Sequence, residues 1–287
     1  VCSSDLELFN AQTVIMATGG FGANKDMRPM DGILYYGPVS STGDGHKMAE
    51  DMGAELRFMD HMKVYPQGVE VAPGQAQLTT FASNELVSMG AVYVNSSGER
   101  VMDETKDLVS IKKKTLAQPD KQLFIVFDQA MKDKMDSALV FNTSDETIEE
   151  YIQEPGRIAR FDELAEAADA MGIDPQKLST TIEEYNQYVE QGEDPKFERS
   201  NLNQKIEEGP FYIMEQKPRT ATSLGGLNVA LDMKVLDKEQ NPIPGLYAAG
   251  EIIGAAHGDE SMPGVCTLWA FVSGKKAGEE AALELME

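Results

Sequence analysis

Short runs of β-branched and aromatic residues recur along the chain, and several of them end in glycine. The runs that predict strands are "AQTVIMATGG" at 11–20, "KQLFIVFD" at 121–128, "PFYIMEQ" at 210–216 and "GLYAAGE" at 245–251. The segment "VYVNSSGERVMDE" at 92–104 predicts two further strands around a turn at 96–98. A glycine at a strand end lets the backbone turn sharply and leaves it open to a ligand.

Helical patterns dominate the middle of the chain. Between residues 144 and 208, apolar residues fall on one face of "SDETIEEYIQ", "FDELAEAADAMG" and "PQKLSTTIEEYNQYVEQG". A shorter amphipathic helix is predicted in "STGDGHKMAEDMGAEL" at 41–56, with Gly53 as its stop. The order is β-rich, mixed, helical and again β-rich. This order predicts an α/β protein in which one domain is inserted within another.

Composition narrows the classes of function. With 287 residues, 41% of them hydrophobic, the chain is expected to be globular. The net charge of −23 argues against nucleic acid or an anionic membrane as a partner, because both require a positive protein face. Two cysteines and three widely spaced histidines argue against a disulfide framework and against a metal site. No apolar run approaches the length of a membrane span.

The segment 245–251 has the clearest chemical logic. Ligands of α/β sheets bind beyond the carboxyl ends of the strands, where Gly250 allows a turn and Glu251 can accept hydrogen bonds from sugar hydroxyls. A helix predicted to begin near Gly264 would direct N–H groups and a partial positive charge toward that ligand. A buried strand followed by a solvated glutamate explains the same spacing. Both interpretations of the segment, a ligand site and a plain strand end, stay open at this point. The segment "ATGGFG" at 17–22 likewise fits either a turn that faces a ligand or an ordinary tight turn.

An ordered set of segments carries a family resemblance. These are "VIMATGGFGAN", "STGDGHKMAEDMGA", "VYVNSSGERVMDE", "MGIDPQKLSTTIEEYNQYVEQGEDPKFER", "GPFYIMEQKPRTATSLGGLNV" and "PIPGLYAAGEIIGAAHG". Together they resemble the flavoprotein subunit family of fumarate reductase and succinate dehydrogenase, especially its soluble flavocytochrome c and urocanate reductase branch. The resemblance covers nearly the whole chain from Leu8 onward.

The resemblance implies a partial, Rossmann-like FAD-binding domain with an inserted capping domain. We expect the FAD-binding parts at 1–75 and 209–287 and the capping domain at 76–208. The family's N-terminal Gly-rich βαβ unit, which grips the FAD pyrophosphate, does not appear in the sequence. Because the chain also begins without methionine, we expect it to be a fragment of a longer protein.

The resemblance also implies which residues hold FAD. Backbone and small side chains would lie along the dinucleotide and near the flavin ring, and Glu251 would hold the sugar-type hydroxyls. The expected set is Ala17, Thr18, Gly19, Thr42, Gly43, Asp44, Gly45, Gly250, Glu251, Cys266, Thr267 and Leu268. Within it, Cys266 fits a small packing residue better than a thiolate nucleophile.

Four positions matching the family's catalytic residues are changed here. The family binds dicarboxylates with two histidines and two arginines, and the corresponding residues are Tyr65, Thr222, Lys106 and Ser261. Lys106 lies in "MDETKD". The matching family segment follows a "VNE"-like stretch, carries the proton-donating arginine and is about two residues longer. The alternative interpretation of Lys106 is a plain surface lysine. A core aromatic at a strand end is the alternative for Tyr65. Without arginines to clamp two carboxylates, a dicarboxylate substrate is not expected.

The resulting expectation is an FAD-dependent oxidoreductase that reduces or desaturates a C=C or CH–CH bond of a small molecule. A relative of the 3-ketosteroid dehydrogenases is one alternative, and a flavin-binding protein that has lost catalysis is another. An electron-donor protein or a fused upstream domain is the expected electron partner. The sequence does not indicate a compartment.

Overall fold

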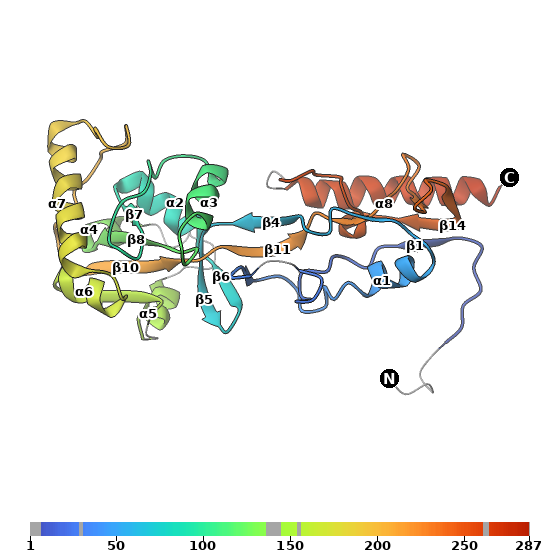
Figure 1. Cartoon of the computed structure of the whole chain (residues 1–287), viewed down its shortest axis with the longest axis horizontal. Coiled ribbons are helices and arrows are strands. Elements are labelled where there is room, and N and C mark those ends of the chain that lie inside the picture. The colour runs from blue at the N-terminus through green and yellow to red at the C-terminus, as the bar shows by residue number, and fades with distance from the viewer. Residues whose placement is uncertain (1–6, 29–30, 136–144, 154–155, 261–263, 287) are drawn as a thin grey trace. The chain divides into compact units, whose positions relative to one another are not determined.

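The protein folds into two compact units, seen in a computed structural model that describes residues 7–28, 31–135, 145–153, 156–260 and 264–286 (Figure 1). The first unit contains residues 1–30, 37–63 and 221–287, and the second contains 31–36 and 64–220. The chain therefore enters and leaves the second unit more than once, and each unit is described by itself below.

The first unit is built on a three-stranded sheet of order β1-β14-β13. Its elements are β1 (Val14–Met16), α1 (Asp44–Asp51), β3 (Leu56–Arg57), β12 (Gly226–Leu227), β13 (Lys234–Leu236), β14 (Pro242–Ala248), η2 (Gly250–Ile252) and α8 (Val265–Glu284). Strands β1 and β14 are parallel, with Ile15 opposite Tyr247. The long helix α8 lies along β14 (Figure 1). The carboxyl ends of β1 and β14 therefore lie at the same edge of the sheet, as a ligand site of an α/β fold requires.

The second unit contains an antiparallel sheet of order β7-β8-β10-β9. Its strands are β7 (Val92–Val94), β8 (Leu123–Asp128), β9 (Ile158–Phe161) and β10 (Phe211–Gln216), and its helices are α2 (Thr80–Met89), α3 (Leu108–Leu116), α4 (Gln129–Lys134), α5 (Asp145–Gln153), α6 (Leu164–Ala170) and α7 (Pro175–Gln191). All six residues of β8 are buried, because the strand has neighbours on both sides and helices packed against it. Its apolar run therefore forms the centre of the larger core.

A five-stranded sheet of order β4-β11-β2-β6-β5 completes the fold. Its strands are β2 (Leu34–Tyr35), β4 (Met62–Tyr65), β5 (Gly68–Ala72), β6 (Gln75–Leu78) and β11 (Arg219–Ser223). The boundaries between the two units fall inside β4 and β11. Candidate site residues at the ends of these strands therefore belong to different units: Tyr65 to the second and Thr222 to the first.

Local sequence explains where the main helices begin and end. The Asp174 side chain caps α7 by accepting from the backbone N–H groups of Gln176 and Lys177, Pro175 occupies the first turn, and Gly192 ends the helix in the left-handed conformation. Asp107 caps α3 in the same way through Val109 and Ser110.

One predicted strand is absent. The segment after the turn at 96–98 forms only an isolated bridge between Val94 and Arg100, and the chain then turns into α3. The reason is that Arg100 and Glu104 enter a buried ion-pair network, which holds the segment in a turn instead of a ladder.

Candidate functional site

A cavity of about 460 Å³ lies in the first unit at the carboxyl end of β14. Its wall includes four expected site residues, Thr222, Glu251, Cys266 and Thr267, together with others that were not expected there, among them Ser223, His257 and Trp269. Three separate stretches of sequence, at 222–223, 251–257 and 266–271, therefore meet around one space. The aromatic residues of this wall had no signal in the sequence beyond their position in an apolar helix.

Glu251 is the acid of this cavity. One of its carboxylate oxygens, Oε1, accepts hydrogen bonds from the backbone N–H of Ser223 at 2.8 Å and from the Ser223 hydroxyl at 3.0 Å. Burial raises the pKa of Glu251, and the two bonds from Ser223 oppose that effect. A Cβ at Gly20 would stand 2.1 Å from the same oxygen. The glycine of the "ATGGFG" turn therefore makes room for the Glu251 carboxylate.

The start of α8 borders the same cavity. Gly264 precedes the helix in the left-handed conformation, and Cys266 and Thr267 of the first turn line the cavity. A helix N-terminus carries unsatisfied N–H groups and a partial positive charge, which suit an electron-rich ligand. The backbone N–H of Leu268 donates to the Gly264 carbonyl at 3.1 Å, and its side chain is exposed.

Hydrogen bonds fix α8 against the turn after β14. The indole N–H of Trp269 donates to the Gly250 carbonyl at 3.2 Å, and the Gly250 N–H donates to the Ser273 hydroxyl at 2.9 Å. Gly250 has a φ of +77°, which favours glycine at this turn. These bonds hold the acid and the helix N-terminus in a constant arrangement.

Close backbone approaches continue toward α1. A Cβ at Gly45 would stand 2.0 Å from the Thr18 hydroxyl oxygen, and one at Gly43 would stand 2.4 Å from the sulfur of Met27. Thr18 follows β1 together with Ala17 and Gly19, whereas Thr42 and Asp44 flank the start of α1. The expected dinucleotide residues at 17–19 and at 42–45 are thus brought side by side in the first unit. Glycine at the approach points, a carboxylate that can accept from sugar hydroxyls and a helix N-terminus fit the chemistry of FAD.

Tyr65 is half-buried at the end of β4 in the second unit. Its ring stands 4.8 Å from the guanidinium carbon of Arg219, which also lies 4.2 Å from the Tyr36 ring. Arg219 is 1% exposed, donates to the Gln67 carbonyl, and has no carboxylate within ion-pair distance in the described ranges. Sequence reasoning missed this arginine, although it stands in the quoted segment "KPRTATSLGG".

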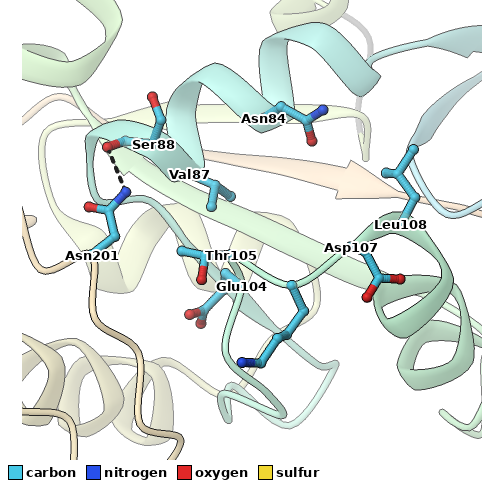
Figure 2. A pocket seen from close by; sticks show the side chains of 9 residues that line it. Asn84, Val87, Ser88, Glu104, Thr105, Asp107, Leu108 and Asn201 are labelled. Atoms are coloured by element: carbon cyan, nitrogen blue, oxygen red, sulfur yellow. Dashed lines mark hydrogen bonds between the residues drawn. The ribbon is translucent and has the colours of Figure 1, made fainter.

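Lys106 borders a cavity of about 300 Å³ between α2 and the start of α3 (Figure 2). The cavity wall also includes Asn84, Val87, Ser88, Glu104, Thr105, Asp107, Leu108 and Asn201. The Lys106 ammonium stands 3.1 Å from a carboxylate oxygen of Asp103. Lys106 is therefore an exposed side chain with a defined partner at the rim of a cavity. Ser261, the fourth candidate, lies outside the described residues.

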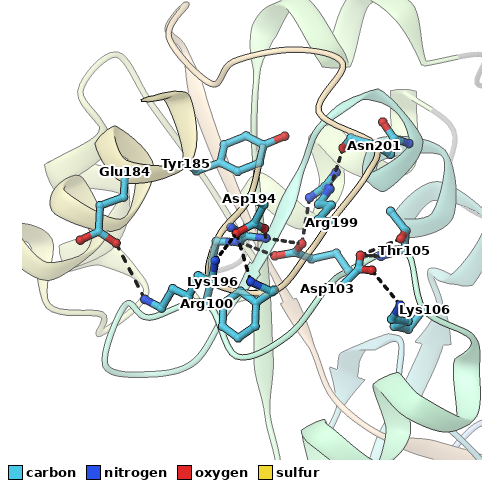
Figure 3. Close-up of polar contacts among 12 residues, drawn as sticks. Arg100, Asp103, Thr105, Lys106, Glu184, Tyr185, Asp194, Lys196, Arg199 and Asn201 are labelled. Atoms are coloured by element: carbon cyan, nitrogen blue, oxygen red, sulfur yellow. Dashed lines mark hydrogen bonds and ion pairs between the residues drawn. The ribbon is translucent and has the colours of Figure 1, made fainter. Parts of the chain in front are cut away.

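A buried ion-pair network stands directly beside Lys106 (Figure 3). Arg100 donates to both oxygens of Glu104 at 2.8 and 2.9 Å and to Asp194 at 2.8 Å, and Arg199 donates to Glu104 at 2.9 Å. Arg199 also donates to the carbonyls of Val87 and Ala91 at the end of α2. The positive charges of the two arginines are balanced by the negative charges of Glu104 and Asp194, and buried charges need such pairing. The sequence alone did not indicate this network, because its members are far apart along the chain.

The fold and the first cavity define a class of protein, an α/β domain that binds a dinucleotide cofactor at the carboxyl ends of its strands. Comparison with known proteins specifies the family: the chain belongs to the family described as FAD binding domain, whose model matches residues 3–267. This match confirms the expected fold class and the expected cofactor, FAD.

Relatives agree with that assignment. The urocanate reductase of Eggerthella lenta is 36% identical over 282 residues, which cover 96% of this chain and 45% of the relative. A flavocytochrome c3 fumarate reductase in its open conformation is similar in structure, with a TM-score of 0.76 and 28% identity over 96% of this chain and 47% of that chain. The 3-ketosteroid-Δ4-(5α)-dehydrogenase of Rhodococcus jostii has a TM-score of 0.66 and 26% identity over 94% of this chain and 53% of that chain.

These similarities confirm the resemblance to the fumarate reductase flavoproteins. The chain spans about half the length of the relatives it matches. Across the described ranges, no helix combines the length and the apolar character that crossing a membrane would need.

Proposed function

We propose that the protein containing this chain is an FAD-dependent oxidoreductase that acts on the activated C=C bond of a small molecule that is not a dicarboxylate. One observation carries the substrate part of the proposal. The four positions that the family resemblance assigns to substrate binding are Tyr65, Lys106, Thr222 and Ser261, and none of them is an arginine. Binding two carboxylates in a protein of net charge −23 without bidentate guanidinium groups is unfavourable.

Arg219 does not replace the missing clamp. Its Nε and Nη2 atoms already donate to the Gln67 carbonyl and the Thr80 hydroxyl, and the side chain is buried. A bidentate contact to a substrate carboxylate needs two adjacent N–H groups that face an open space. The burial and the existing hydrogen bonds of Arg219 support a substrate with one carboxylate or with a carbonyl group. The E. lenta relative is named for urocanate, which carries a single carboxylate.

Each candidate side chain has a chemical role in this proposal. Bound FAD would supply or accept the hydride at its N5 position. Glu251 would hold the sugar-type hydroxyls of the cofactor, and the first turn of α8 would stabilise negative charge on the reduced flavin ring. Thr222, which lines the cavity of the first unit, would donate a hydrogen bond to the carbonyl that activates the C=C bond, and Tyr65 is the candidate donor of the second unit. Lys106 would give a proton to the carbon that does not receive the hydride.

Desaturation of a ketosteroid is a second candidate function. The similarity to the Rhodococcus jostii dehydrogenase and the half-buried phenol of Tyr65 both favour it. This reaction runs in the opposite direction, so it needs an electron acceptor and not a reductant. A flavoprotein without catalysis is the third candidate, motivated by the change at all four positions.

A substrate panel tests the proposal on the complete, FAD-loaded protein. The flavin is reduced chemically without oxygen and mixed with fumarate, urocanate, acrylate, an aromatic enone or a 4-ene-3-ketosteroid, and reoxidation is followed by its absorbance. We expect rapid reoxidation by a monocarboxylate or enone and at least tenfold slower reoxidation by fumarate, the difference that loss of a bidentate contact costs, about 1.5–3 kcal/mol. Fumarate as the fastest oxidant would contradict the proposal. Oxidised enzyme that desaturates a ketosteroid would favour the second candidate.

A further inference from the structure

Asp103 and Lys106 form a pair of unequal exposure at the start of the turn before α3. The Lys106 ammonium lies 3.1 Å from Asp103 Oδ2, and the two side chains are 59% and 5% exposed, respectively. The buried carboxylate is thus the fixed member of the pair and the ammonium the accessible one. Figure 3 shows the Lys106 side chain directed toward this carboxylate.

The Asp103 carboxylate is itself held in place. Its Oδ1 accepts from the Thr105 backbone N–H at 2.9 Å and from the Thr105 hydroxyl at 2.6 Å, which leaves Oδ2 for the lysine. Burial acts to raise the pKa of Asp103, but the bonds from Thr105 and Lys106 outweigh it, and the pKa lies below its ordinary value. The group is therefore an anion at neutral pH.

The neighbouring residue anchors the turn to the core. Glu104 is 1% exposed and binds both Arg100 and Arg199, and Arg199 in turn donates to the carbonyls at the end of α2. The chain at Glu104, next to Asp103, therefore cannot shift without breaking a buried ion pair, which is costly. The position of Asp103 is set by the core and not by the lysine.

We propose that Asp103 is the positioning residue for Lys106, an inference that rests on the proposed function, in which Lys106 is the proton donor. A lysine ammonium is a point charge on a flexible four-carbon stem, whereas an arginine presents a rigid planar fork. A lysine in the place of the family's arginine needs an external group to direct it. The Asp103 carboxylate, 3.1 Å from the ammonium, supplies that group.

The proposed step balances without participation of Asp103 in bond breaking. An N–H bond of the Lys106 ammonium breaks as a C–H bond forms at the substrate carbon next to the one that receives the hydride. Lysine becomes a neutral amine and regains a proton from water. The Asp103 carboxylate keeps its charge throughout and contributes only by orienting the donor, an effect that can amount to 10²-fold when a reacting group is misplaced by about 1 Å.

A double-mutant cycle in the complete, FAD-loaded protein tests this inference. The variants are Asp103→Asn, Lys106→Met and the double variant, assayed with the substrate that the panel identifies. We expect Asp103→Asn to lower kcat by roughly 10- to 100-fold with little change in KM, because positioning acts on the chemical step. In the Lys106→Met background the same substitution should lower kcat by less than about twofold, since two residues that act as one unit are not additive. The double variant Asp103→Asn/Lys106→Arg, in which a rigid guanidinium has less need of an external group to direct it, should regain activity over Asp103→Asn.

A matched control and a stability measurement separate positioning from structure. Glu99 and Lys177 form a comparable pair at 2.9 Å on the surface of the second unit, so Glu99→Gln makes the same change of charge and should leave kcat unchanged. An equal loss from Asp103→Asn in both backgrounds, or a parallel fall in melting temperature, would overturn the positioning role and leave the proposed function intact. Full activity of Lys106→Met would overturn the proton-donor role of Lys106 and, with it, the positioning role of Asp103.

Discussion

At the scale of single residues, the candidate cofactor site contains a carboxylate with a fixed orientation. Ser223 holds one oxygen of Glu251 through two hydrogen bonds, and Gly20 leaves room for it. The remaining carboxylate oxygen can accept from a ligand hydroxyl. The sequence located this acid correctly at the end of a strand, but its serine partner comes from a segment 28 residues earlier.

We expect Glu251→Gln to weaken FAD binding in the complete protein. A hydrogen bond to a charged acceptor contributes about 1.5–3 kcal/mol, so the dissociation constant should rise roughly 10- to 100-fold. Flavin fluorescence, which is recovered when FAD dissociates, measures this change. Glu279→Gln is the control, because Glu279 lies on α8, is paired only with Lys275 among the described residues and does not line the cavity. Equal FAD affinity for wild type and Glu251→Gln would exclude the assigned role.

At the scale of elements, α1 carries a buried histidine that couples its packing to pH. His46 is 0% exposed and its ring meets that of Phe21 edge to face at 5.3 Å. Burial, opposed only in part by the backbone of Ile252, lowers the pKa of His46 to about 4. The helix that borders the dinucleotide residues is therefore packed on a neutral imidazole.

Stability should consequently fall as the pH drops through a defined window. The unfolded chain binds a proton at His46 below about pH 6.5, whereas the folded chain binds it only near pH 4. Lowering the pH across this interval favours the unfolded state by up to roughly 3 kcal/mol. Urea unfolding at pH 7 and pH 4.5 measures the loss, and the difference between wild type and His46→Leu removes the contribution of carboxylates that titrate in the same range. An identical pH dependence of the two proteins would contradict the prediction.

Elements also differ in how well local sequence specified them. Helices α3 and α7 begin at aspartates that cap them, and α7 ends at Gly192, so their boundaries follow from residues close in sequence. The expected strand after the turn at 96–98 did not form, because distant partners, Asp194 and Arg199, take the charged side chains of that segment into the core. A local pattern cannot report an interaction with residues about 95 positions away.

At the scale of the whole molecule, each unit has its own hydrophobic core. The first unit also exposes apolar side chains, including Val14 and Ile15 of β1 and Phe271 and Val272 of α8. Patches of this kind often mark surfaces that are covered in the functional protein.

The isolated chain of 287 residues should therefore bind FAD weakly. Pyrophosphate binding at a Gly-rich helix N-terminus is a main source of affinity for dinucleotides, and this sequence has no such motif. Isothermal titration of the purified chain with FAD checks the prediction, and the complete protein is the comparison. A stoichiometric yellow complex of the isolated chain that survives gel filtration would refute it.

The sequence by itself determined the family, the cofactor and the turn, acid and helix start that border the first cavity, because strand ends, glycines and helix caps are encoded by neighbouring residues. Only the tertiary structure decided which side chains act together. It joined Ser223 to Glu251, placed Arg219 between two tyrosines, and set Lys106 against a carboxylate anchored beside a buried network. Burial and pairing of charges depend on residues brought together by folding, and a one-dimensional pattern holds no distances between them.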